Sequence, residues 1–100
     1  MICYNINISG KVHKTGLRYF LKQKASELNI TGSVTYLNDN TVSVLAIGEK
    51  SDIDDFVKHC KTGNPGSIIQ EINKEQFPLQ TFDSFDVVDT TKVINMNINV

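Results

Sequence analysis

Residues 2–28, ICYNINISGKVHKTGLRYFLKQKASEL, change their hydrophobic period once, and this change determines the first half of the fold. Apolar residues first occupy every second position, which is the pattern of a strand with one buried face. Beyond Gly16 they recur at helical spacing instead. The stretch therefore predicts a strand over residues 2–9, a glycine-containing loop, and an amphipathic helix over residues 17–29.

The middle of the chain predicts a hairpin and a second helix. Apolar residues alternate over residues 34–46 on both sides of the polar turn LNDN, which is typical of a β-hairpin. Ser51 and Asp54 have the spacing of a capping box at the start of a helix over residues 52–61. Gly63 follows that helix and tolerates the left-handed conformation that ends helices.

Two extended segments complete the predicted order. Ile68 begins the first segment, and beyond Pro78 the residues Phe82, Phe85 and Val87 indicate a last strand. The order βαββαβ within about 90 residues is typical of the ferredoxin-like α+β fold. We therefore expect an antiparallel sheet with both helices on one face.

The end of the chain has a pattern of its own. We expect residues 1–88 to form one domain and residues 89–100, DTTKVINMNINV, to form a C-terminal extension. Apolar residues alternate with asparagine in this extension, which predicts an extra strand. Two interpretations are open: an edge strand or frayed terminus of the same monomer, or a strand that pairs with a second subunit in a dimer.

Composition excludes several classes of function. The chain has 100 residues, a formal charge of −1 and a pI near 6.0, which argues against a nucleic-acid binder. No apolar run approaches the roughly 18 residues of a membrane span, and the first residues lack the pattern of a secretory signal. We therefore expect a cytoplasmic protein without membrane contacts. Cys3 and Cys60 are too few and too far apart for a metal site or a disulfide framework.

One stretch has the features of an anion site. Gly10 and Gly16 flank a basic loop, and Arg18, the single arginine among ten basic residues, lies in the first turn of the predicted helix. Backbone N–H groups at a helix start are unpaired and carry partial positive charge, and a guanidinium adds a two-pronged donor. The residues leave two interpretations open: a phosphate site, or a plain turn with Arg18 in solvent.

Three segments resemble the acylphosphatase family. GKVHKTGLRYF resembles that family's signature loop, roughly GxVQGVxFRxF, and ASELNITGSVTYLNDNTVSVLAIGE resembles AxxLGLxGWVxNxxDGxVxVxAxGE. TGNPGSIIQEI resembles GPPxAxVxxV, so the likeness covers about residues 5–88 without a gap. The resemblance implies the ferredoxin-like fold and hydrolysis of the mixed anhydride between a carboxylate and phosphate. It also implies that the ligand is an acyl phosphate or inorganic phosphate, with no metal and no cofactor.

The resemblance also implies site residues. The phosphate-binding residues are those of one loop: His13, Lys14, Thr15, Gly16, Leu17 and Arg18. The family's water-orienting asparagine falls on Tyr36, which thus takes a catalytic position together with Arg18. Lys14 stands where the family has glycine, and His13, in place of glutamine, either is exposed or contacts the anion when protonated. Asn38 would face the same side of the strand as Tyr36 only if that strand stays regular up to the turn.

Two functions remain open at this point. The first is a slow acylphosphatase, favoured because the single arginine, Arg18, falls on the motif position. The second is a catalytically inactive phosphate-binding or interaction domain, favoured by Tyr36, by Lys14 and by the strand-like extension. RNA binding on the same topology is set aside because the third strand, TVSVLAIG, has no aromatic residue for base stacking.

Overall fold

The computed structural model describes residues 1–88, and its elements follow the predicted order. They are β1 (Ile2–Lys11), α1 (Leu17–Glu27), β2 (Thr31–Asn38), β3 (Thr41–Gly48), α2 (Lys50–Thr62), β4 (Ile68–Phe77) and β5 (Phe85–Val87). The βαββαβ prediction is confirmed, and β5 is the short strand predicted after Pro78. The extra strand predicted within residues 89–100 lies outside the described residues.

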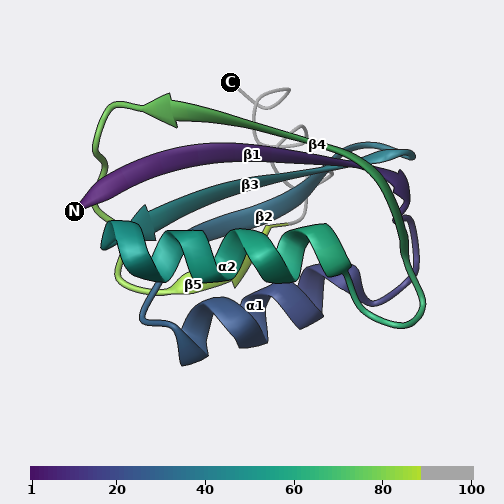
Figure 1. The fold of residues 1–100 in the computed structure, drawn as a ribbon, viewed down its shortest axis with the longest axis horizontal. Helices are drawn as coiled ribbons and strands as arrows, with labels where there is room; N and C mark the ends of the chain where they lie inside the picture. The colour runs from purple at the N-terminus through teal and green to yellow at the C-terminus, as the bar shows by residue number, and fades with distance from the viewer. Residues whose placement is uncertain (89–100) are drawn as a thin grey trace, which may run out of the picture.

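The strands form one sheet in the order β4-β1-β3-β2-β5. The pairs from β4 to β2 are antiparallel as predicted, whereas β5 runs parallel to β2 and makes the sheet mixed. The chain leaves β4 at one edge and reaches β5 at the opposite edge (Figure 1). Because β5 runs opposite to β4, this connection needs only to pass around one end of the sheet.

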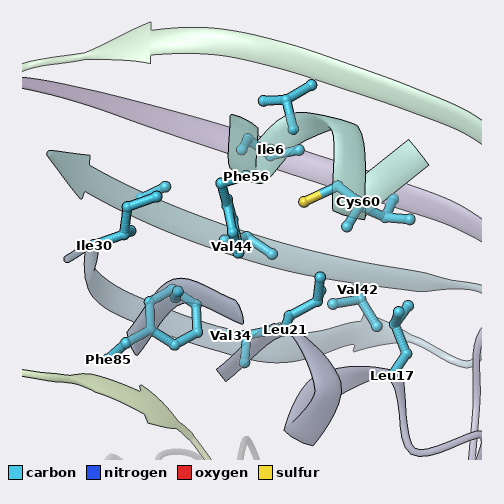
Figure 2. Close-up of a cluster of buried hydrophobic side chains, with 14 of the residues drawn as sticks. Ile6, Leu17, Leu21, Ile30, Val34, Val42, Val44, Phe56, Cys60 and Phe85 are labelled. Carbon is cyan, nitrogen blue, oxygen red and sulfur yellow. The ribbon is translucent and has the colours of Figure 1, made fainter. Parts of the chain in front are cut away.

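Both helices cover the same face of the sheet, and the core lies between these two layers (Figures 1 and 2). Buried side chains of the core come from both layers: Ile6, Ile8, Val34, Val42, Val44 and Ala46 from strands, and Leu17, Leu21, Ala25, Ile53, Phe56 and Cys60 from helices. Phe56 and Phe85 meet edge to face with ring centroids 5.9 Å apart, so the short β5 is also attached to the core. The alternation in the sequence thus marks the helix-covered face.

The predicted capping box of α2 is wrong. The helix begins at Lys50 with Glu49 as its N-cap, and no side chain caps it. Ser51 and Asp54 therefore lie inside the helix, where Asp54 accepts a hydrogen bond from Lys50 Nζ at 3.0 Å instead. The predicted end is confirmed, because Gly63 follows the last helical residue, Thr62, with a positive φ of 69° that glycine adopts without strain.

Three connections meet at the end of the sheet remote from the N-terminus (Figure 1). The end of β1 contacts the β2–β3 turn, where the N–H of Gly10 donates to the carbonyl of Asn40 at 3.0 Å, and His13 of the β1–α1 loop lies 3.9 Å from Asp39 of the same turn. The α2–β4 loop contacts the β1–α1 loop through Asn64 and Thr15. The fold therefore places the loop predicted to bind an anion between two other segments. None of the helices in residues 1–88 is long and apolar enough to cross a membrane.

Candidate anion-binding site

The β1–α1 loop adopts a tight, internally bonded conformation. The hydroxyl of Thr15 donates to the carbonyl of Val12 at 2.7 Å, and Val12 is buried, which fixes the start of the loop. Lys14 and Gly16 both have left-handed backbones, with φ 55° and 82°. Glycine adopts this conformation freely, whereas a lysine there is strained by about 1 kcal/mol or more. Two of the three residues directly before α1 therefore have left-handed backbones.

Several N–H groups of this loop and of the first turn of α1 have no protein acceptor. The first backbone bond of α1 runs from Phe20 to Gly16 at 3.0 Å. Within residues 1–88, four preceding N–H groups have no hydrogen-bond partner: those of Thr15, Gly16, Arg18 and Tyr19. Unpaired donors at a helix N-terminus create positive potential and suit an anion.

Two further N–H groups of this segment, those of Leu17 and Lys14, have partners. The N–H of Leu17 points to the hydroxyl of Thr15 at 3.4 Å, a long contact. The N–H of Lys14 donates to the hydroxyl oxygen of Tyr36 at 2.8 Å. The loop therefore presents some of its N–H donors directly, while the N–H of Lys14 is held by Tyr36, which the sequence predicts at a catalytic position.

Tyr36 contacts the arginine as well as the loop. The guanidinium carbon of Arg18 lies 4.1 Å from the centroid of the Tyr36 ring, within the range of a cation–π interaction. The same carbon lies 5.7 Å from the ring of Tyr19, which is an exposed side chain. Among residues 1–88, Arg18 forms no ion pair with a carboxylate. Within the described residues, the Arg18 side chain is therefore positioned by aromatic rings, and no carboxylate neutralises its charge.

His13 also contacts Tyr36. The two rings have centroids 4.8 Å apart, and His13 Nδ1 lies 3.9 Å from Asp39 Oδ1 in the β2–β3 turn. The Asp39 side chain is 91% exposed, so the attraction between the pair is strongly screened by water. Tyr36 thus touches three of the predicted loop residues, His13, Lys14 and Arg18.

Asn38 does not continue the strand that carries Tyr36 in regular register. The pairing of β2 with β3 shifts between Tyr36 and Asn38, so the strand is not regular up to the turn. Asn38 Oδ1 accepts a hydrogen bond from the N–H of Asn40 at 2.9 Å and therefore belongs to the turn.

Asn64 is a residue at this site that the sequence did not indicate. Its side-chain Nδ2 donates to the carbonyl of Thr15 at 2.7 Å, from the α2–β4 loop. The two residues are 49 positions apart, and a local pattern carries no signal for such a contact. Gly66 in the same loop makes room, because a Cβ there would lie 2.9 Å from the Thr15 oxygen.

Comparison with known proteins identifies the family. The family model for acylphosphatase matches residues 4–87. The chain belongs to the acylphosphatase family. An acylphosphatase of Archaeoglobus fulgidus is 34% identical over 87 residues, which cover 87% of this chain and 98% of that protein. The resemblance seen in the sequence is thereby confirmed, and with it membership of a hydrolase family.

Solved structures of acylphosphatases share the fold. The crystal structure of the Bacillus subtilis acylphosphatase has a TM-score of 0.85 at 30% identity, covering 88% of this chain and 99% of that one. An acylphosphatase from Coxiella burnetii has a TM-score of 0.84 at 29% identity, covering 87% and 92%. The ferredoxin-like sandwich predicted from periodicity is therefore the acylphosphatase fold.

Proposed function

We propose that this acylphosphatase-family chain hydrolyses the carboxyl–phosphate bond of acyl phosphates. Arg18 and the N–H groups of the β1–α1 loop would hold the phosphoryl oxygens. The observation that carries the proposal is Arg18, whose guanidinium forms no ion pair within residues 1–88 and which belongs to a segment, residues 15–19, where four backbone N–H groups have no acceptor among the described residues. Donors that are already oriented toward developing negative charge supply much of the rate enhancement of many enzymes.

The reaction needs only water besides the substrate. The water oxygen forms a bond to phosphorus, the bond from phosphorus to the acyl oxygen breaks, and the electron pair of that bond leaves with the carboxylate. The products are a carboxylate and inorganic phosphate, and the proton lost by the water passes to phosphate or to solvent. The donors of the loop and Arg18 would stabilise the negative charge spread over the phosphoryl oxygens while the bond to water forms and the bond to the acyl oxygen breaks.

We further propose that turnover is lower than in a site with the family's asparagine. The hydroxyl oxygen of Tyr36 is already bonded to the N–H of Lys14 and does not reproduce a carboxamide that orients water. Loss of one oriented hydrogen-bonding group typically reduces turnover by about 100- to 1,000-fold. Phosphate binding depends on Arg18 and the other amides and is therefore affected less than hydrolysis.

The alternative is a phosphate-binding or interaction domain without activity. The specific observation that favours it is the same bond from Lys14 to Tyr36, which occupies one of the donors that the loop would otherwise offer to phosphate. In this case inorganic phosphate would stabilise the folded state, because it binds only that state, but acyl phosphates would not be consumed.

An assay with acetyl phosphate separates the two functions. We expect the wild-type protein to hydrolyse it above the blank without protein and Arg18→Ala to lose that activity. Lys22→Ala is the matched control, since Lys22 lies on the same helix and is paired with Asp86 at 4.0 Å, and its activity should be unchanged. Hydrolysis equal to the blank, together with a higher unfolding temperature in phosphate, would establish the binding domain instead.

A further inference from the structure

The two polar atoms of the Asn64 side chain are in different situations. Its Nδ2 donates to the Thr15 carbonyl at 2.7 Å, while its Oδ1 is buried and has no hydrogen-bond partner within residues 1–88. A buried acceptor without a partner costs free energy, so such an amide is a poor choice for stability alone. The bond from Asn64 to Thr15 is therefore better explained by its effect on the β1–α1 loop.

The Thr15 carbonyl is the acceptor that a longer α1 would use. In a regular helix the N–H of Tyr19 would donate to the carbonyl four residues earlier, which is that of Thr15. That bond is absent from residues 1–88, and the first helical bond runs from Phe20 to Gly16. The Thr15 oxygen instead accepts from Asn64 Nδ2, and the N–H of Tyr19 has no acceptor within residues 1–88.

The hydrogen bond from Asn64 to Thr15 also fixes the direction of the Gly16 N–H. The peptide bonds are trans throughout the described residues, so the N–H of Gly16 points away from the carbonyl of Thr15. That carbonyl faces Asn64, and the Gly16 N–H consequently faces away from the α2–β4 loop. One side-chain amide thus orients two donors that the loop offers to an anion.

We propose that Asn64 is a positioning residue of the phosphate site. It holds the Thr15 carbonyl so that the N–H groups of Gly16 and Tyr19 stay available to the phosphoryl oxygens. Asn64 does not contact the substrate in this scheme and acts through the peptide between Thr15 and Gly16. The inference rests on the proposed function, since it takes the β1–α1 loop as the place where phosphate binds.

Amide hydrogen exchange of the ligand-free protein tests whether Asn64 keeps the Tyr19 N–H away from the Thr15 carbonyl. In Asn64→Ala and Asn64→Leu, the Tyr19 N–H should close onto the Thr15 carbonyl and exchange about tenfold or more slowly than in the wild type. Asn73→Ala is the matched control, because it removes an exposed amide bonded to Glu71 on β4, and Tyr19 should exchange there as in the wild type. Unchanged exchange of Tyr19 in both Asn64 variants would overturn the proposal.

Titration with inorganic phosphate tests the consequence for binding. Both Asn64 variants should raise the Kd for phosphate by about threefold to tenfold, the value of one lost or misdirected hydrogen bond. Asn64→Leu also removes the unpartnered oxygen, so its unfolding temperature should stay near that of the wild type, which a purely structural role would not allow. If the Asn64 variants bind phosphate as tightly as the wild type, the positioning role of Asn64 is overturned and the proposed function is not. No phosphate binding by the wild type would overturn the proposed function as well.

Discussion

The hydroxyl oxygen of Tyr36 lies 2.8 Å from the backbone nitrogen of Lys14 and accepts its hydrogen. These are two positions at which the sequence resemblance predicts a departure from the acylphosphatase pattern, a tyrosine for asparagine and a lysine for glycine. Lys14 has a left-handed backbone with φ 55°, which glycine adopts without strain. The tyrosine therefore stabilises the loop conformation that the lysine disfavours, and the two departures are physically connected.

A double-mutant cycle measures this connection. Tyr36→Phe removes the hydroxyl and should lower the free energy of unfolding by about 0.5–1.5 kcal/mol in urea denaturation. Lys14→Gly relieves the backbone strain, so Tyr36→Phe should cost less on the Lys14→Gly background than on the wild type. The difference between the two costs is the coupling energy. Additive effects, with a coupling energy near zero, would show that the hydroxyl does not support the strained loop.

Gly16 is expected to be the least replaceable residue of the loop. Its φ of 82° is unfavourable for alanine, and an added Cβ would lie 3.4 Å from Asn64 Nδ2. Gly16→Ala should therefore destabilise the protein by about 1 kcal/mol or more. Gly16→Asn is the control for the backbone effect, because asparagine tolerates the left-handed region, and it should cost less in the same denaturation experiment. An alanine variant as stable as the wild type would contradict the loop conformation.

Both cysteine thiols are expected to be unreactive in the folded protein. Burial raises the pKa of Cys3 above its ordinary value and raises that of Cys60 to about 12. The thiolate is the reactive form, so very little of it is present near pH 7, and each thiol is also shielded from reagents. A colorimetric thiol reagent should label neither cysteine in buffer and both in denaturant. Rapid labelling of the native protein at pH 7 would be inconsistent with this core.

The strands, the helices and the family could be predicted from the sequence because each depends on local patterns. Ile6 and Ile8 alternate with polar residues since one face of β1 is buried, and Leu17 and Leu21 recur at helical spacing for the same reason. The start of α2 was predicted incorrectly. The pair Ser51 and Asp54 matches a capping box in sequence, but Asp54 bonds to Lys50 inside the helix.

The connections within the site could not be predicted, because they join distant parts of the chain. Lys14 and Tyr36 are 22 positions apart, and Thr15 and Asn64 are 49 apart. The motif indicates which residues face the phosphate in the family, but not which side chain holds a loop amide or a loop carbonyl in this chain. The parallel pairing of β5 with β2 is also a matter of topology, since a three-residue strand carries no signal of its partner.

The most direct measurement is the kcat of Tyr36→Asn for acetyl phosphate, compared with Tyr36→Phe and the wild type. Both substitutions remove the hydroxyl that holds Lys14, but only asparagine supplies a carboxamide that can orient water. We predict that Tyr36→Asn raises kcat by about tenfold or more, part of the 100- to 1,000-fold effect of one oriented group, while Tyr36→Phe gives no gain. A kcat for Tyr36→Asn no higher than that of the wild type would contradict the account that Tyr36 occupies the position of the water-orienting residue.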